Sequence, residues 1–441
     1  TLQNDLRLEL GASPLRASLG GLYNRSDGHR PNMEFEQYGA NLNLAVDLGS
    51  HWRVGGQAEM IHFNSSNPGS IASPLIDNDA EVTRLQASVR LSHRHEELSG
   101  GVTLFYNQGY HLINDGHAVA EEPTDYRYHS RDRLWGLTLR EELSLPTKSL
   151  LTMGVDLFRF GGRAWNRILE DGHDEELIDK EEWEGALFTE LQQGVGRRLT
   201  LDVGLRYDHH SAVGGVWIPH FGFSINTPRG GALRASVSKG FRFPTLRERF
   251  LFRSANPHLE PEEVVNYEVA WSQTTPRQRL RYGINLFYLE GKNLIQTRWI
   301  EGRPHNENSG RIENWGVEGE FVWQVAKALQ LEGNYSYLHM RHPVLASPEH
   351  KAHLGVRLEV GRWRLQASGN YIHGLYTSLP TESEPAQRSS YLDLGVNTSL
   401  RVARWLTLWL RGENLLDRTY EINAGFPMPG ITLTGGVEIG F

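Results

Sequence analysis

The sequence of 441 residues predicts an all-β protein, a transmembrane antiparallel β-barrel with about 21 strands in this chain. Segments of about ten residues alternate apolar and polar side chains along the whole length, as strands with one lipid-facing and one water-facing side require. Short turns and long polar connections alternate between these segments. The 12 Trp, 16 Tyr and 16 Phe are enough for an aromatic belt at each membrane surface.

The composition excludes several other classes of protein. The chain has no cysteine, so it forms neither disulfides nor thiolate metal sites. It has no apolar run of 18 residues and a mean hydropathy of −0.47, which excludes membrane-spanning helices. Barrel strands escape this test because only alternate side chains are apolar. The net charge of −8 argues against a nucleic-acid partner.

The last eleven residues, from Ile431 to Phe441, show the alternation most clearly. Apolar residues or Gly occupy every odd position, whereas Thr432, Thr434 and Glu438 lie on the opposite face. A soluble antiparallel sheet also alternates in this way, so this segment alone leaves two folds open. The same pattern recurs at 137–145, 329–337 and 405–411, and this repetition favours the membrane barrel.

The connections predict the direction of every strand. Short turns are predicted at 13–15, 49–51, 94–95, 146–148, 195–198, 227–230, 275–277, 325–327, 360–362 and 402–404. Long polar loops are predicted at 26–37, 65–80, 110–132, 163–181, 210–216, 242–263, 302–310, 341–350, 375–389 and 415–430. The segment 279–301 is predicted to be one strand bent near Gly291, because splitting it would break this alternation. Outer-membrane barrels have short periplasmic turns and long outer loops, so the C-terminus is expected in the periplasm.

Two segments carry motifs of one family. Residues 238–268 contain an F-R-x-P element followed by an N-P-x-L-x-P-E element, and the C-terminal segment carries further matches. The chain therefore resembles the TonB-dependent outer-membrane receptors of Gram-negative bacteria. The matching residues are Phe241, Arg242, Pro244, Asn256, Pro257, Leu259, Pro261, Glu262, Asn414, Asp417 and Phe441.

The resemblance implies a 22-stranded barrel filled by an N-terminal plug. It also implies uptake of a scarce metal complex, either a ferric siderophore or cobalamin, with energy supplied by the TonB complex through the plug. Haem is less favoured, because residues 245–255 contain no His. No plug segment is found in the sequence, and the strand directions imply that one ascending strand is also missing before Thr1. The expected partner is a separate plug-containing chain or fragment of a split receptor; a truncated form of one long chain is the alternative.

Three groups of residues are candidates for sites. Aromatic, basic and imidazole side chains of the outer loops could hold a metal chelate, although residues of an aromatic belt would look the same: Tyr110, His111, His117, Tyr126, Arg127, Tyr128, Trp165, Trp217, Phe252 and Arg253. Charged residues of the lumen could bond a plug or merely line water: Arg140, Glu142, Glu332, Arg411, Glu413 and Glu438. Asp77, Asp79 and Glu81 could bind Ca²⁺ or form an ordinary solvated acidic loop.

Two other functions remain open from the sequence. A passive porin-like channel or a surface receptor scaffold would use the same barrel. A membrane-embedded hydrolase would need a nucleophile motif, and no G-x-S-x-G is present. We therefore expect a transporter that is not an enzyme and that requires no cofactor, embedded in the lipid of the Gram-negative outer membrane.

Overall fold

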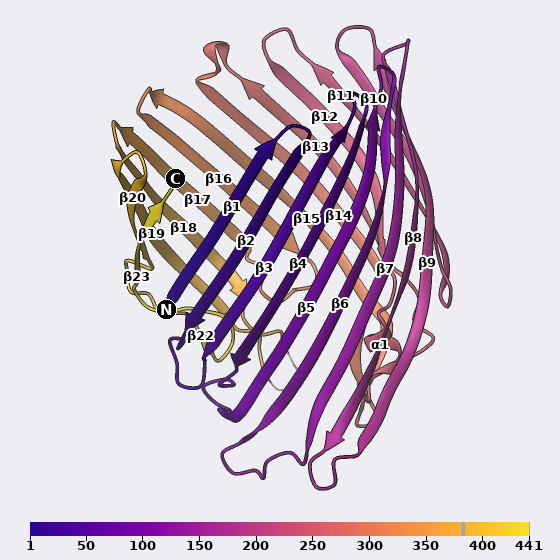
Figure 1. The fold of residues 1–441 in the computed structure, drawn as a ribbon, viewed down its shortest axis with the longest axis vertical. Coiled ribbons are helices and arrows are strands. Elements are labelled where there is room, and N and C mark those ends of the chain that lie inside the picture. The colour runs from indigo at the N-terminus through magenta and orange to yellow at the C-terminus, as the bar shows by residue number, and fades with distance from the viewer. Residues whose placement is uncertain (381–383, 441) are drawn as a thin grey trace.

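The computed structural model describes residues 1–380 and 384–440, and it confirms the predicted all-β fold. Twenty-one strands form one meandering sheet, in which each strand is antiparallel to the next, and the sheet curls into a barrel (Figure 1). Within these described residues, no helix is both long and apolar enough to cross a membrane. The strands of the first half are β1 (Leu2–Ala12), β2 (Leu15–Ser26), β3 (Phe35–Leu48), β4 (Trp52–Ser66), β5 (Leu75–Arg94), β6 (Leu98–Ala118), β7 (Tyr126–Leu145), β8 (Ser149–Ile168), β9 (Asp174–Val195) and β10 (Leu199–His210).

The second half continues the meander and carries the two small helices. Its strands are β11 (Gly214–Asn226), β12 (Gly231–Arg242), β13 (Glu262–Thr274), β14 (Leu280–Ile300), β15 (Arg303–Ala326), β16 (Leu329–Met340), β17 (His350–Val360), β18 (Trp363–Tyr376), β19 (Arg388–Ala403), β20 (Leu406–Glu413) and β23 (Thr432–Ile439). Helix α1 (Leu246–Phe250) lies between β12 and β13, and the 3₁₀ helix η1 (Pro276–Gln278) lies between β13 and β14. Two short strands, β21 (Glu421–Asn423) and β22 (Phe426–Pro427), form a separate hairpin.

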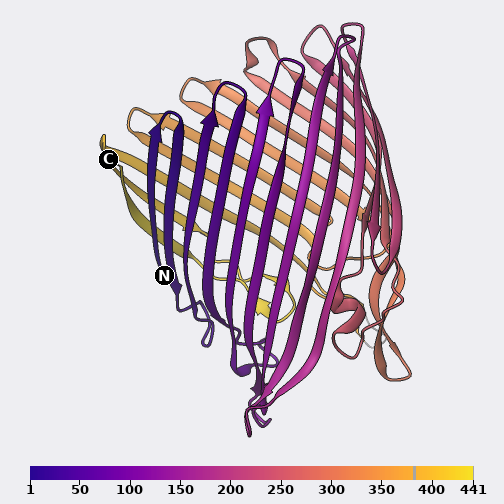
Figure 2. The same cartoon turned by 45° about the vertical axis from the view of Figure 1, so that its right-hand side comes forward.

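All ten predicted short turns fall between strands at one end of the barrel, which we call the short-turn end. The opposite end, the long-loop end, differs from the prediction. Strands β5 to β9 continue far into the predicted loops. The connections left at this end are only 67–74 before β5, 119–125 between β6 and β7, and 169–173 between β8 and β9. Figure 2 shows these strands reaching below their neighbours at the lower edge of the picture, and we call them the tall wall. Beyond the membrane both faces of a strand meet water, so apolar alternation no longer marks it, although its backbone ladder continues.

Strands β14 and β15 form a second tall hairpin. The predicted loop at 302–310 is wrong, because Glu301 and Gly302 alone make the turn, with φ of 51° and 75°. The predicted bend near Gly291 is confirmed. The register of β14 against β15 shifts between Gly291 and Leu294, and Asn293 has a φ of 59°, so the strand bulges there without ending.

The outward face of the barrel is apolar and is bordered by tryptophans at both ends. Trp315 and Trp323 lie on the same face of β15 and are both nearly half exposed. Their eight-residue separation corresponds to about 26 Å along a strand. For a strand tilted by about 40° this is about 20 Å across the membrane, which fits within the roughly 25 Å apolar band of outer-membrane barrels. Outward tryptophans nearer the long-loop end are Trp135, Trp183, Trp217 and Trp315, and those nearer the short-turn end are Trp52, Trp323 and Trp363.

The barrel sheet has two free edges. Among the described residues β1 pairs only with β2 and β23 pairs only with β20, so no ladder joins β1 to β23. Both edge strands run from the long-loop end to the short-turn end, a direction that excludes antiparallel pairing between them. We call the space between them the seam.

At the long-loop end the seam is bridged by loops. There the loop that carries β21 and β22 reaches the loops near the N-terminus. His29 Nε2 lies 2.9 Å from the carbonyl oxygen of Pro427, and the amide of Ile71 donates to the carbonyl of Gly425 at 2.9 Å. Loop contacts therefore hold the two edges of the sheet near each other, without strand pairing.

Candidate functional site

The F-R-x-P element forms a clamp at the start of α1. The guanidinium of Arg242 donates two hydrogen bonds to Glu248, at 2.8 and 2.9 Å, and a third to Glu262 at 2.5 Å. Glu248 also accepts from the amide and hydroxyl of Thr245, and Thr245 in turn caps the helix. Burial alone would raise the pKa of Glu248, but these hydrogen bonds outweigh it and hold the pKa below its usual range.

The N-P-x-L-x-P-E element latches the same loop onto β15. The amide of Asn256 donates to the carbonyl of Glu248 at 3.0 Å, and its side chain donates to the carbonyl of Asn306 at 2.9 Å. The side chain of Asn308 accepts a hydrogen bond from the amide of Glu260 at 2.8 Å and donates one to the carbonyl of Glu260 at 2.9 Å. Asn306 is 5% exposed and its side chain also donates to Glu248. Nothing in the sequence singled out Asn306 or Asn308, because both fall within a predicted loop.

A buried ion pair fixes α1 to the barrel wall. Arg249 on the helix donates to Glu182 on β9 at 2.6 Å, and both side chains are less than 10% exposed. His210 at the end of β10 is 1% exposed, and its Nε2 lies 3.4 Å from the same carboxylate. The amide of Ala212 donates to His210 Nδ1, so a neutral ring carries its proton on Nε2, toward Glu182. The sequence motifs did not identify this cluster.

The remaining residues of the first motif pack around this loop. The side chain of Leu259 is buried, with 3% of its surface exposed. The rings of Phe241 and Phe243 pack edge to face with their centroids 4.9 Å apart. The carbonyl of Pro257 accepts a hydrogen bond from Arg249 at 3.5 Å. The motif residues therefore support the opening of the barrel at the long-loop end, which we call the mouth, and those with described contacts make them within the protein. This architectural role explains their pattern without assigning them to a ligand.

A second ion network lies on the lumen face of β8 to β10. Arg206 makes a two-pronged pair with Asp208, at 2.7 and 2.8 Å, and donates to Asp156 at 2.6 Å. Asp208 is 1% exposed. The planar guanidinium suits such two-pronged bonding, and it links β8 to β10 across the intervening strand. The network stiffens the wall beside the α1 loop.

The C-terminal motif organises the loop that bridges the seam. Asn414 is 4% exposed, and its side chain donates to the carbonyls of Arg418 and Pro429, both at 2.9 Å. It also accepts from the amide of Arg418, while Asp417 accepts from the amide of Ile431. Asn414 has a φ of 47°, a left-handed conformation that Asn tolerates well. The last motif residue, Phe441, lies outside the described residues.

The six charged residues expected in the lumen all lie on its polar face, opposite the apolar side chains of their strands. They line three hollows of about 270, 480 and 950 Å³. The first contains Glu332, Arg411 and Glu413; the second contains Arg411 and Glu438; the third contains Arg140 and Glu142, which are bonded at 2.9 Å. A plug as their partner stays a prediction.

The structure does not bring the predicted ligand residues together. Most lie in strands that extend beyond the predicted loops, and strand alternation divides them between two faces. The outward face carries Tyr110, Arg127, Trp165 and Trp217, and the inward face carries His111, Tyr126 and Tyr128. The other three lie elsewhere: His117 is near the end of β6, and Phe252 and Arg253 follow α1. A single site made of all ten is therefore excluded by their positions.

Several of these side chains already have partners. The hydroxyl of Tyr110 lies 2.9 Å from His129, whose ring stacks on Trp165 with centroids 5.3 Å apart. On the inward face, His111 lies 3.4 Å from Asp132, and Tyr126 donates to Asp115 at 3.1 Å. These contacts rigidify the tall wall.

The comparisons with known proteins agree with this architecture. The family model described as TonB dependent receptor-like, beta-barrel matches residues 14–438. The chain belongs to this family. The receptor barrel matches solved structures of the same fold, among them one named copper transporter OprC, with a TM-score of 0.82 and 15% identity. That match covers 100% of this chain and 78% of the solved one.

Two curated relatives were also found. One is the iron-regulated outer membrane virulence protein of Vibrio cholerae, 23% identical over 307 residues, which cover 64% of this chain and 42% of the relative. The other is the vitamin B12 transporter BtuB of Photobacterium profundum, 20% identical over 414 residues, covering 88% and 61%. The receptor barrel thus spans less than two thirds of the length of these relatives. The matched family is one of receptors, so the chain belongs to a receptor family and not to a family of enzymes.

The predicted calcium ligands are not gathered in the receptor barrel. Asp77, Asp79 and Glu81 lie on β5, where Asp77 has a φ of 53° and Asp79 accepts from Asn114 at 3.4 Å. Over residues 1–380 and 384–440, a single group offers three ligand atoms within 4.8 Å of one another: Glu190, Asp202 and His220. His220 is hydrogen-bonded to Asp202 directly, and this contact accounts for the closeness of the two side chains without a metal. Calcium binding by the three predicted carboxylates remains a prediction.

Proposed function

We propose that the receptor barrel serves TonB-dependent uptake of a scarce metal complex across the Gram-negative outer membrane. The observation that carries this proposal is the wide 21-stranded sheet, with an apolar band outside and rows of charged side chains inside. The names of the similar proteins mention iron regulation, vitamin B12 and copper, which all involve a metal. A ferric siderophore or cobalamin is the leading cargo, and haem is less favoured.

The long-loop end is proposed to face the cell exterior, with the C-terminus on the periplasmic side. The latched loop around α1, the loop that carries β21 and β22, and the tall wall all lie at the long-loop end. A mouth built of rigid, hydrogen-bonded loops suits capture of a ligand from dilute solution, because little ordering is left to occur on binding. The inward-facing His111, Tyr126 and Tyr128 and the exposed Phe252 and Arg253 are the proposed contacts for the cargo.

A plug is proposed to fill the lumen and to transmit the pull of the TonB complex. The supporting observation is the set of charged hollows, because an empty lumen of this width would be an open hole. The seam supports a further part of the proposal: one strand of opposite direction could pair with β1 and β23 at once. We propose that this strand belongs to the plug-containing segment, which is either a separate chain of a split receptor or a further part of the same polypeptide.

Native mass spectrometry of the receptor purified from its own outer membranes tests the split. A complex of this chain with a second polypeptide supports it. The chain alone, at about 50.0 kDa and without any co-purifying fragment, contradicts it, and so does one long polypeptide that contains the barrel.

Uptake measurements test the function. Cells that lack the gene are supplied with one metal complex at a time, labelled on the metal, in strains with and without TonB. The proposal predicts that uptake of one complex requires both the gene and TonB. Uptake of every complex at parental rates in the gene-deficient strain would refute it. The same strain carrying the gene on a plasmid is the control.

A passive porin is distinguished by electrical conductance. The receptor reconstituted with its partners into planar bilayers should be nearly silent, because the plug blocks the lumen. Steady, ohmic conductance at the size expected of an open barrel would favour the porin.

A further inference from the structure

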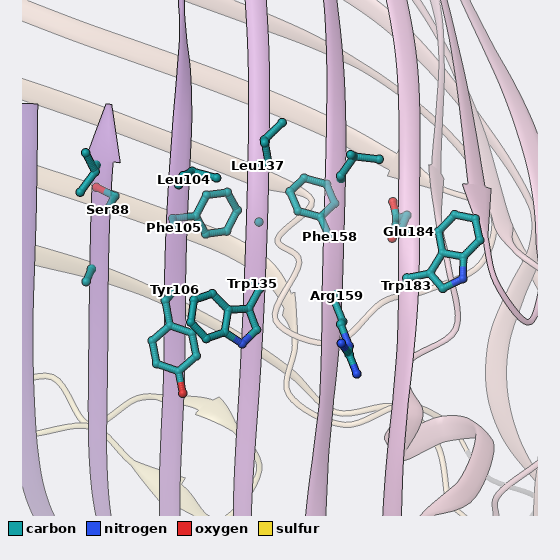
Figure 3. A pocket seen from close by; sticks show the side chains of 14 residues that line it. Ser88, Leu104, Phe105, Tyr106, Trp135, Leu137, Phe158, Arg159, Trp183 and Glu184 are labelled. Carbon is teal, nitrogen blue, oxygen red and sulfur yellow. The ribbon is translucent and has the colours of Figure 1, made fainter. Parts of the chain in front are cut away.

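The outer wall of β5 to β9 has an apolar depression of about 520 Å³ (Figure 3). One bank is made of leucines, including Leu104, Leu137 and Leu157, and the other contains Tyr106 and Trp135, whose ring centroids are 4.2 Å apart. Cross-strand pairing places each bank in one row across neighbouring strands. The depression therefore runs between two rows of side chains on one face.

This face is the outside of the barrel. Leu104 and Trp135 are each 56% exposed, and they belong to the same alternation as the apolar band. Residues of one lumen-facing row lie between the two banks and form its floor: Ser88, Phe105, Gly136, Phe158 and Glu184. The next lumen-facing rows on either side, which include Asn107 and Thr138, do not line the depression. Its aromatic bank lies where the apolar band ends, and β6 to β9 continue for about 30 Å beyond that bank. The depression thus sits at the membrane surface of the long-loop end.

Arginines follow the aromatic bank directly. Arg159 lies in the same row as Trp135, Arg133 lies in the next row, and Arg131 and Arg163 pair in the row after that. Figure 3 shows Arg159 beside Trp135, at the edge of the depression. These four cations form what we call the arginine rim.

The charge changes sign with distance from the membrane. Beside the four arginines of the rim, the same three rows hold two carboxylates, Glu181 and Asp179. Glu181 bonds Arg159 at 2.5 Å and lies 3.6 Å from Arg133, so it neutralises only one of them. Arg131 makes no ion pair within the part of the chain that the structure describes. The next two rows reverse the balance, with two arginines against four carboxylates: Arg127, Arg167, Asp79, Glu81, Glu176 and Asp174.

We propose that the depression and the arginine rim bind one phosphate-bearing lipid of the leaflet at the long-loop end. Its acyl chains lie along the leucine bank, Tyr106 and Trp135 mark the level of the headgroup, and the phosphate bonds Arg133 and Arg159. The apolar floor excludes a soluble anion as the natural occupant, because such an anion would leave it exposed. The positive rows stand at the height of lipid headgroups, where a cation attracts anionic lipid.

Native mass spectrometry of the receptor in a non-ionic detergent, titrated with bis-phosphorylated lipid A, tests the proposal. The double variant Arg133→Gln/Arg159→Gln should bind at least tenfold more weakly. The control is Arg341→Gln, because Arg341 is as exposed as Arg159 (66% against 67%) and is paired with Glu313 at the same 2.5 Å. Arg341 lies between β16 and β17, away from the depression. The control should bind as the parent does.

The heat-dependent gel shift of intact barrels shows whether the double variant folds. If it does not fold, a second variant keeps the test decisive. Glu181→Gln removes the carboxylate that competes for Arg159, and it should bind the lipid several-fold more tightly. Phosphatidylcholine, whose headgroup has no net charge, should bind weakly to parent and variants alike. Equal binding of lipid A by the parent, the double variant and Glu181→Gln would overturn the proposal, and so would equal binding of phosphatidylcholine.

Discussion

The clamp around α1 makes a quantitative prediction for Glu248→Ala. The carboxylate accepts two bonds from Arg242 and two from Thr245, and it is the only acceptor that joins them. Without it, Arg242 keeps its bond to Glu262 but no longer holds the helix. We expect the segment 243–261 to open locally while the barrel stays intact, because its strands do not depend on this clamp.

The size of the effect follows from the exposure of the partners. The Arg242 side chain is 43% exposed, so solvent screening reduces its pair with Glu248 to about 2 kcal/mol rather than the value of a buried pair. Loss of the capping box adds about 1 kcal/mol. A change of about 3 kcal/mol in the free energy of opening corresponds to roughly 100-fold faster exchange of the protected amides.

Hydrogen exchange followed by mass spectrometry measures this directly. The reporting amides are those of Arg249, bonded to Thr245 at 3.1 Å, and Asn256, bonded to Glu248 at 3.0 Å. Glu248→Gln should fall between parent and alanine variant, since an amide oxygen still accepts. Arg247→Gln, an exposed change in the same helix, is the control. Acceleration below threefold, or an equal effect of the control, would refute the assignment of the clamp to the carboxylate.

Three further predictions concern the same end of the barrel. Arg249→Met leaves the Glu182 carboxylate buried without its cation; we expect a loss of about 3–5 kcal/mol in local stability and rapid protease cleavage within 243–261, and unchanged cleavage would contradict it. Asn414→Ala removes three hydrogen bonds at a positive φ and should destabilise the loop 414–431 by about 2–3 kcal/mol in exchange experiments, whereas Asn414→Gly, which tolerates that φ, should lose about 1 kcal/mol less. Acid should release the clamp, because the pKa of Glu248 is lower in the folded loop than its unfolded value near 4.3. The stabilisation by the Glu248 carboxylate is therefore complete above that value and is lost as the pH falls through the folded pKa. Amide exchange of 243–261 that is insensitive to pH between about 5 and 3, after correction for the intrinsic rate, would contradict this prediction.

The sequence predicted the strand order well because lipid imposes a strong pattern. Within the membrane, each strand must present apolar side chains on alternate positions, and the turns at the short-turn end carry Gly and Pro. The bend at Gly291 could also be predicted, since the direction of all later strands depends on it. These features follow from local composition and strand parity.

The mouth could not be predicted in the same way. Above the membrane both faces of a strand are wet, so the ends of β5 to β9 carry no apolar alternation and looked like loops. The faces of neighbouring residues such as Tyr110 and His111 depend on register, which residue type does not reveal. Asn306 was missed for a related reason, because its partners lie about 50 residues away in the chain.

The tall wall of β5 to β9 makes the receptor lopsided. Opposite it, β16 to β20 and β1 to β3 are much shorter, so the rim is low on the side that contains the seam. With the proposed orientation, the tips at 119–125 and 169–173 are among the described parts of the chain that a large particle would meet first as it approaches the cell. These tips are the natural epitopes for antibodies, and antibodies raised against them should label intact cells. Under the proposed function, small solutes would pass over the low rim, so bulky agents would be recognised on one side of the long-loop end and cargo would enter on the other.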